Sequence, residues 1–190
     1  RPDARQRRPE GRREQLHRRG PRQPCPESNH QPAFLARQRG HARALGGHCL
    51  ARAGGVPQTY HVFMSHVHWD HIMGFPFFAP VYIPGNRIVI HGCHAELEEA
   101  FRRQQAAPCF PVGFDQLAAT IEFDVMEPER EYRVAGLAVR AKLQRHGGDS
   151  YGWRFESADK VLVYSTDSEH PQDDPAHIDR FVDFFRDADL

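Results

Sequence analysis

Three histidines and one aspartate fall within six residues, directly after an apolar segment that reads TYHVFMSH. The β-branched and aromatic residues of this segment predict a buried strand. At the end of a strand, residues i and i+2 project to the same side, so His66 and His68 can present two imidazoles to one ion. Asp70 and His71 follow the point at which the chain turns, so they can serve a second ion. Polar groups can lie in such an apolar segment if a metal satisfies them.

The residue types of this cluster indicate which metals it would bind. Imidazole and carboxylate are ligands of zinc and of other first-row divalent metals. Surface or core histidines without a common role are the alternative, and this would be the better interpretation of a single histidine. For the pattern H-x-H-x-D-H directly after a strand, the sequence predicts a metal site.

The net charge of zero hides two very different halves. Residues 1–52 hold 13 Arg against 4 acidic residues, and residues 53–190 hold 12 Lys and Arg against 21 acidic residues. Residues 1–43 lack Val, Ile, Met, Trp and Tyr, so they cannot bury enough apolar surface to offset the entropy of ordering. Three interpretations are open for residues 1–43: a basic arm that binds nucleic acid, a disordered tail, or the one we favour, an out-of-frame translation of GC-rich coding sequence.

Residues 44–190 form the second predicted unit, in which helical and strand patterns mix throughout. This mixture predicts an α/β or α+β domain. A short helix is expected near residues 44–53. The apolar residues of PAHIDRFVDFF recur at i, i+3, i+4 and i+7, which predicts an amphipathic helix. Its apolar face should hold Ile178, Phe181, Val182 and Phe185. The other expected elements are a strand RIVIHG, a helix HAELEEAFRRQQ, a hairpin turning near Ala135 and Gly136, and strands YGWRFES and KVLVYSTD.

The segment at residues 66–71 resembles the signature of the metallo-β-lactamase fold, an αββα sandwich of hydrolases. Farther along the chain, LQRHGGDSYGWRFE resembles the segment that carries the later histidine of this family, which gives that role to His146. VLVYSTD resembles the strand that delivers the bridging aspartate, here Asp167. The resemblance covers roughly residues 44–190 and implies a partial αββα sandwich.

The resemblance also implies a set of metal ligands, because family members typically bind two divalent ions. Zinc is the expected metal, with manganese as the alternative. Asp70 is the candidate catalytic residue, which would orient the attacking water or take a proton from it. The implied ligands are His66, His68 and His146 for one ion, Asp70 and His71 for the other, and Asp167 as a bridge between both.

The sequence after His146 favours one branch of the family. A lone histidine followed by Ser-Tyr-Gly-Trp-Arg resembles the phosphodiesterase and ribonuclease Z branch. Asp167 follows His146 by 21 residues, which leaves no room for the long Gly/Pro-rich arm of tRNA-processing ribonuclease Z. The resemblance implies a hydrolase that uses hydroxide activated by two metals on a cyclic nucleotide or another small phosphodiester. The alternatives are a lactam or thioester hydrolase of the same fold, and a non-catalytic fragment with a basic nucleic-acid-binding arm.

Two parts of the family's pattern are missing from the sequence. RQRGHA stands where the family has an Asp-Ala-Gly-Thr-Gly type loop, which is why we favour a change of reading frame upstream. The last metal-binding histidine of the family normally lies beyond FFRDADL, where this sequence stops. His170 and His177 do not stand at its place. The expectation is therefore a fragment whose activity is in doubt.

Cysteine usage and hydropathy indicate in which compartment the protein is expected. The four cysteines form no C-x-x-C pair and no disulfide framework, which favours a reducing, cytoplasmic location. No apolar stretch is long and clean enough to span a bilayer. The expected partner is a small-molecule or nucleotide phosphodiester substrate, with a homodimer as one assembly to test, and binding to nucleic acid stays an open question.

Several other residues have candidate roles. HGCHAE at residues 91–96 could suggest a second metal site, but packing and capping are the favoured interpretation. Cys109 is interpreted as a small buried residue. Arg154 could face a phosphate, although an arginine on a strand surface is favoured. Ser165 and Glu169 are candidates for orienting Asp167.

Overall fold

The computed structural model describes residues 56–170 and 174–190. The predicted segment at residues 1–43 and the predicted short helix near residues 44–53 lie outside these described residues. Within the described residues, no helix is long and apolar enough to cross a membrane.

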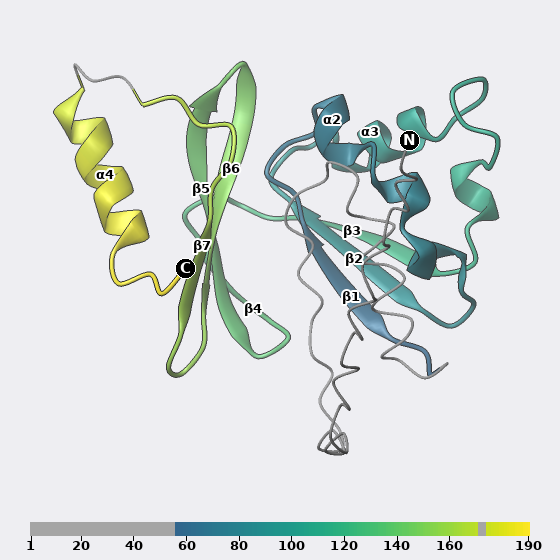
Figure 1. Ribbon diagram of the computed structural model, residues 1–190, viewed down its shortest axis with the longest axis horizontal. Helices are drawn as coiled ribbons and strands as arrows, with labels where there is room; N and C mark the ends of the chain where they lie inside the picture. Colours follow the sequence, from purple (N-terminus) through teal and green to yellow (C-terminus); the bar gives the residue numbers. More distant parts are fainter. Residues whose placement is uncertain (1–55, 171–173) are drawn as a thin grey trace, which may run out of the picture.

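The first sheet has three parallel strands in the order β1-β2-β3. Its strands are Thr59–Phe63, Arg87–Gly92 and Thr120–Val125. Parallel strands need crossover connections, and here short helices supply them on one face of the sheet (Figure 1). These helices are α2 (Trp69–Ile72), η1 (Phe75–Phe77), η2 (Ala79–Tyr82), α3 (Leu97–Gln104) and η3 (Phe114–Gln116).

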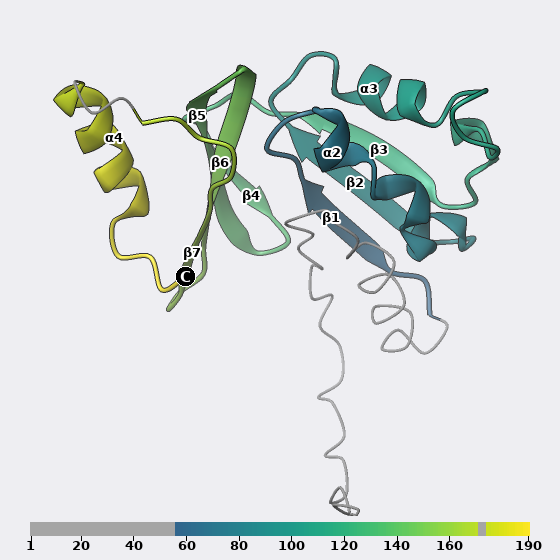
Figure 2. The same cartoon turned by 45° about the horizontal axis from the view of Figure 1, so that its top comes forward.

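The second sheet is antiparallel, in the order β4-β5-β6-β7. Its strands are Glu131–Val134, Leu137–His146, Gly148–Glu156 and Val161–Tyr164, and α4 (Pro175–Phe185) follows them. Figures 1 and 2 show α4 outside this sheet, and α2 and α3 outside the first one. The layers therefore run α, β, β, α, which confirms the predicted αββα sandwich.

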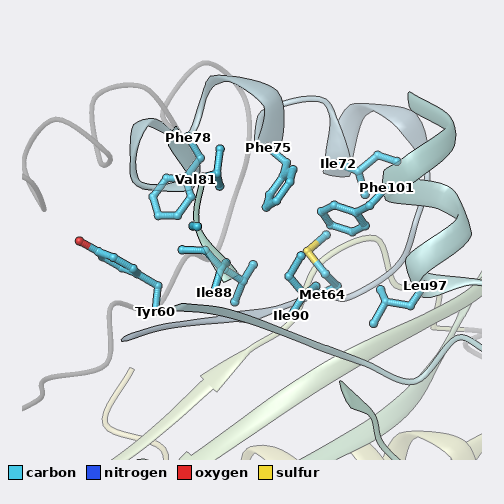
Figure 3. Close-up of a cluster of buried hydrophobic side chains, with 12 residues drawn as sticks. Tyr60, Met64, Ile72, Phe75, Phe78, Val81, Ile88, Ile90, Leu97 and Phe101 are labelled. Carbon is cyan, nitrogen blue, oxygen red and sulfur yellow. The ribbon is translucent and has the colours of Figure 1, made fainter. Parts of the chain in front are cut away.

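The outer core lies between the first sheet and its helices (Figure 3). Side chains alternate along β1, so Tyr60, Val62 and Met64 face the helical layer. They pack there against Phe75 and Phe101, two buried rings whose centroids lie 4.9 Å apart. The segment GFPFFAPVYIP thus supplies core residues to this layer.

The inner core lies between the two sheets and fixes the end of β1 against β6. Phe63 and Trp153 are buried there with their ring centroids 5.1 Å apart. The indole Nε1 of Trp153 donates a hydrogen bond to the carbonyl of Met64 at 3.0 Å. The backbone N–H of Tyr151 donates to the carbonyl of Ser65 at 2.8 Å. These bonds hold the chain in place immediately before the histidine cluster.

The expected elements over the described residues are confirmed, including the hairpin turn, where Ala135 and Gly136 both have positive φ angles. The predicted apolar face of α4 is confirmed for Phe181 and wrong for its other three residues. The buried residues of α4 are His177, Phe181 and Phe184, whereas Ile178, Val182 and Phe185 are exposed. The buried stripe is rotated relative to the predicted one because His177, a polar residue by pattern, packs against the ring of Phe181 at 4.7 Å between centroids.

Two single-residue interpretations are also corrected. Cys109 is exposed, because it follows the end of α3 in a surface turn rather than in the core. Arg154 is neither a free surface arginine nor directed at a ligand. Its Nη1 donates to the carbonyls of Phe184 at 2.9 Å and Arg186 at 2.7 Å, so it holds the C-terminal end of α4 on β6.

Candidate metal centre

The candidate site begins where β1 leaves the first sheet. The N–H of Met64 still pairs with the carbonyl of His91 at 2.8 Å, and the chain then turns out of the sheet. The carbonyl of His68 accepts hydrogen bonds from the N–H groups of His71 at 3.0 Å and Ile72 at 3.3 Å, which starts α2. This turn brings two histidines before α2 and one within it to the same edge of the sandwich.

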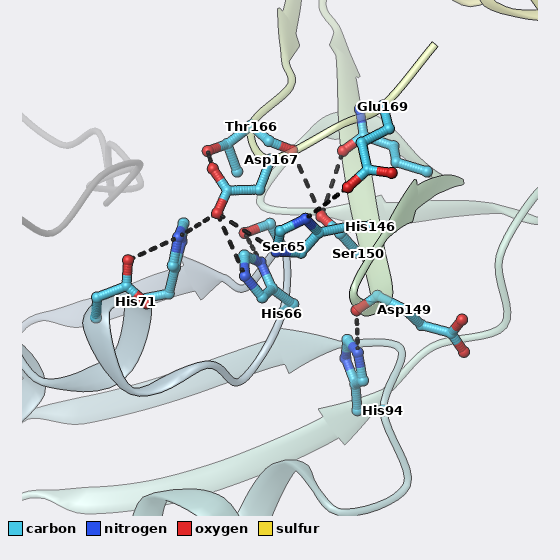
Figure 4. Close-up of polar contacts among 12 residues, drawn as sticks. Ser65, His66, His71, His94, His146, Asp149, Ser150, Thr166, Asp167 and Glu169 are labelled. Carbon is cyan, nitrogen blue, oxygen red and sulfur yellow. Dashed lines mark hydrogen bonds and ion pairs between the residues drawn. The ribbon is translucent and has the colours of Figure 1, made fainter. Parts of the chain in front are cut away.

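Two overlapping groups of possible metal donors meet at this edge (Figure 4). In each group, one ligand atom from every member lies within 4.8 Å of the others. His66 belongs to both groups, so two ions held by them would be neighbours. The first group is His66, His68 and His146, and the second is His66, His71 and Asp167.

Asp167 faces three of the histidines with one carboxylate oxygen. Its Oδ2 atom lies 3.0 Å from Nε2 of His71 and 3.7 Å from Nε2 of both His66 and His146. Asp167 follows β7 with φ at 40°, a left-handed conformation that is uncommon outside glycine but favoured by Asp and Asn. A polar side chain is therefore held in an unusual backbone position where it points at the cluster, as strained positions at functional sites often do.

Asp70 is placed differently from the other candidate ligands. Its Oδ2 lies 3.6 Å from Nε2 of His71, and its side chain is half exposed. Among the described residues, neither donor group includes Asp70. The structure thus brings five of the six candidate residues into the two donor groups and leaves Asp70 at the rim. The roles of Asp70 as a ligand and as a catalytic residue stay predictions.

The electrostatics of the cluster suit a bound cation. The pKa of His66 is lowered to about 4, mainly by burial and in addition by the neighbouring His71 and His68. Burial raises the pKa of Asp167, but the hydroxyl of Thr166 and the charge and hydrogen bond of His71 outweigh this effect, so that its pKa is lowered. At neutral pH, His66 is uncharged and Asp167 is ionised, which are the states that bind metal.

A buried atom without a partner provides a direct test of whether these residues fit a metal. Nε2 of His66 is buried and makes no hydrogen bond, and the residue is 1% exposed. Buried polar atoms are nearly always satisfied, so an orphaned one at the centre of a donor group indicates a missing partner. A divalent ion fits this place, because neutral imidazole nitrogen and carboxylate oxygen are its usual donors.

The surrounding contacts were only partly predictable. Glu169 lies near His146, with Oε1 to Nδ1 at 3.9 Å, rather than next to Asp167. Ser165 bonds with Gln144, so its predicted role beside Asp167 is wrong. Sequence reasoning missed two hydroxyl groups, and the only signal for them was their position immediately before a candidate ligand. They are Ser65, with Oγ 3.1 Å from Nδ1 of His66, and Thr166, which donates to Oδ1 of Asp167 at 3.1 Å.

The residues of HGCHAE do not form a second metal group within the described part of the chain. Nδ1 of His91 lies 2.9 Å from Asp124, and Nε2 of His94 lies 2.8 Å from the carbonyl of Asp149. Burial raises the pKa of the Cys93 thiol to about 12. The favoured interpretation, packing, agrees with these contacts.

An αββα sandwich that gathers histidines and an aspartate at one edge of its two sheets is the architecture of the metallo-β-lactamase fold. The chain belongs to the β-lactamase superfamily, because the family model described as "Beta-lactamase superfamily domain" matches residues 24–189. Among curated protein sequences, none matches the chain.

Solved structures with a similar fold include the metallo-β-lactamase fold protein YhfI from Bacillus subtilis. It is 18% identical, with 77% of this chain and 54% of that chain covered at a TM-score of 0.53. Human tRNase Z, short form, is 16% identical, with coverages of 68% and 55% and a TM-score of 0.47. Yeast PDE1 is 13% identical, with coverages of 67% and 39% and a TM-score of 0.46. This chain spans about half the length of the first two.

Proposed function

We propose that the protein is a metal-dependent hydrolase that acts on phosphodiester bonds with two divalent ions. The main support is the sharing between the two donor groups: His66 belongs to both, and one oxygen of Asp167 faces histidines of both. Nε2 of His66 can bind one ion, so its membership of both groups makes them adjacent, and the carboxylate of Asp167 is the group that can bridge two ions. When bound, such a pair polarises a phosphoryl oxygen and lowers the pKa of water toward about 7.

The residues of the chain have distinct tasks in this proposal. His66, His68 and His146 offer the first ion three imidazoles, and His71 and Asp167 complete the second group. Asp167 also offsets part of the positive charge because its pKa is lowered. The hydroxyl of Ser65 beside Nδ1 of His66 fixes which ring nitrogen faces the cluster.

Asp70 is the proposed proton acceptor. Its carboxylate is half exposed and lies next to His71, so it borders the cluster on the side open to solvent. A carboxylate at this rim can accept a hydrogen bond from the attacking water and orient it toward the substrate. Its place outside the two donor groups leaves its oxygens available for this task.

The preference for phosphodiesters over lactams or thioesters has a separate support. The sequence after His146, GGDSYGWRFE, resembles the phosphodiesterase branch of the fold. In the structure this sequence forms β6, which runs directly from the cluster into the inner core at Trp153. Zinc is the proposed metal, since four of the five donors are imidazoles and three of them belong to one group.

Metal content and substrate choice test this proposal together. Protein purified without chelator is analysed for zinc and manganese, and assayed with bis(p-nitrophenyl) phosphate and with a chromogenic cephalosporin. We expect bound metal and hydrolysis of the phosphodiester, both lost in His68→Ala. His170→Ala is the matched control, because His170 is an exposed histidine outside both donor groups. Hydrolysis of the cephalosporin alone would overturn the substrate class, and metal content unchanged in His68→Ala would overturn the site.

A further inference from the structure

A cavity lies between β5 and α4, on the other side of this strand from the inner core. Its volume is about 400 Å³, which is within the usual range of small-molecule sites. His146 lines this cavity and also belongs to the candidate metal centre. The lining residues that matter for its chemistry are Lys142, Arg145, His146, His177, Arg180 and Phe181.

Two arginines that line the cavity form no ion pair among the described residues. Arg145 extends from β5 and Arg180 from α4, and both are exposed. Within the described residues, neither guanidinium makes an ion pair or a side-chain hydrogen bond, whereas seven other arginines there form ion pairs, namely Arg87, Arg102, Arg103, Arg130, Arg133, Arg154 and Arg186. Two guanidinium groups that line one cavity and have no ion pair among the described residues favour an anion there.

His177 extends from α4 about one turn before Arg180 and also lines the cavity. The residue is buried, and its Nε2 atom has no hydrogen-bond partner within the described residues. Burial lowers the pKa of His177, the charge of Asp174 opposes this effect, and His170, Arg145 and Arg180 add to the lowering. The ring of His177 packs against Phe181 at 4.7 Å between centroids, while its Nε2 atom is left for a ligand.

The remaining charged groups of the lining leave this positive balance intact. Lys142 is paired with Glu129 at 2.9 Å, and its Nζ lies 5.5 Å from the centre of the Phe181 ring. Asp149 is exposed at the edge of the cavity. With the Lys142–Glu129 pair set aside, the lining holds two arginines and one carboxylate, that of Asp149, which lies across from Arg145 in the β5–β6 register.

We propose that this cavity binds a phosphorylated small molecule, with its phosphate held between Arg145 and Arg180. A guanidinium group presents a planar set of donors that matches the oxygens of phosphate, and such charge-assisted hydrogen bonds are strong. The volume exceeds that of a phosphate group, so an organic part of the ligand occupies the remainder against the ring of Phe181. This site does not depend on the hydrolytic function proposed above.

Inorganic phosphate is the probe for this site. Titrations by calorimetry use full-length protein kept metal-free with a chelator, so that phosphate cannot bind through an ion at the metal centre. We expect saturable binding, weakened about tenfold or more in the double variant Arg145→Gln/Arg180→Gln, because each guanidinium makes charge-assisted hydrogen bonds. His68→Ala should bind phosphate as the wild type does.

The matched control is Arg133→Gln/Arg186→Gln, which removes the same charge from surface positions outside the cavity. Circular dichroism checks that both double variants fold. The absence of saturable phosphate binding by the wild type would overturn the proposal. So would equal affinity in the wild type and Arg145→Gln/Arg180→Gln, or an equal loss in both double variants, which would reveal a general charge effect.

Discussion

Asp167 and His71 lie 96 positions apart in the sequence, yet Oδ2 of one is 3.0 Å from Nε2 of the other. The contact joins the end of β7, in the second sheet, to α2, which belongs to the layer outside the first sheet. Closing the sandwich therefore assembles the candidate metal centre, and neither sheet carries both donor groups by itself. Metal binding should then be coupled to the docking of the two sheets.

Removing the charge of Asp167 should separate metal binding from folding. We expect Asp167→Asn to lose at least about tenfold in zinc affinity, since changes even outside the ligands cost about 10–100-fold at metal sites. Asparagine has nearly the same size and tolerates the left-handed backbone at φ 40°. Zinc affinity is measured by competition with a chromophoric chelator.

Asp187→Asn is the control for this substitution. Asp187 is exposed and also has a positive φ, 57°, but lies outside the donor groups. Its replacement should leave zinc affinity unchanged. Equal affinities in both variants and the wild type would remove Asp167 from the metal centre.

The acid sensitivity of the metal-free protein should depend on His66. Its pKa is about 4 in the folded protein against 6.5 for an ordinary histidine. Between these values the unfolded chain binds a proton that the folded protein does not, so the free energy of unfolding falls as the pH falls from 6.5 toward 4. The loss of stability from this one group is absent above pH 6.5 and reaches its full size, on the order of 3 kcal/mol, below about pH 4.

Urea unfolding at a series of pH values checks this expectation. His66→Gln has no group that titrates in this range at position 66, so its stability should change less steeply between pH 6.5 and pH 4. A slope as steep as that of the wild type would contradict the assigned pKa. Other histidines contribute to both curves, so the difference between the two proteins isolates His66.

The sequence could predict the local part of the metal centre but not its assembly. His66, His68 and His71 follow one predicted strand, and their proximity comes from the geometry of a strand end and one helical turn. His146 and Asp167 come from the far sheet, and only the resemblance to a fold placed them there. The contacts of Glu169 and Ser165 depend on small rotations of the chain after β7, which no pattern of residue types encodes.

The incorrect prediction of the buried face of α4 has a related cause. Phe181 belongs to two possible faces of this helix. The pattern of apolar residues predicts that the face with Ile178 and Val182 is buried, whereas the buried face holds His177 and Phe184. The sheet beneath instead offers a hollow at Gly152, where Phe184 fits, and His177 enters the interface because its ring packs against Phe181. Which stripe is buried depends on the shape of the partner surface, which cannot be read from the helix.

Trp153 should be a major source of stability at the junction of the two sheets. The residue is fully buried, and replacement by Phe leaves the Met64 carbonyl without its donor and opens a cavity in the inner core. We expect Trp153→Phe to lower the free energy of unfolding by about 2–3 kcal/mol. The other tryptophan gives a matched control: Trp69 is 67% exposed, and Trp69→Phe should change stability by less than about 0.5 kcal/mol. Unfolding followed by circular dichroism avoids the altered fluorescence, and similar losses in both variants would contradict this assignment.

Gly152 should control the docking of α4. A Cβ atom at this position would lie 2.8 Å from Nε2 of Gln144 and 3.1 Å from the ring of Phe184. Both neighbours are buried and held in place, so Gly152→Ala should push α4 outward and cost about 1–3 kcal/mol, the usual range for overpacking. Gly147 has nothing within 4 Å of the corresponding position, so Gly147→Ala should be nearly neutral. Urea unfolding gives the stabilities, and limited proteolysis should cleave near α4 earlier in the Gly152 variant. Equal stability and equal resistance to proteolysis in the two variants would mean that Gln144 and Phe184 can move to make room for the added methyl group. The fit of Phe184 at Gly152 would then not determine which face of α4 is buried.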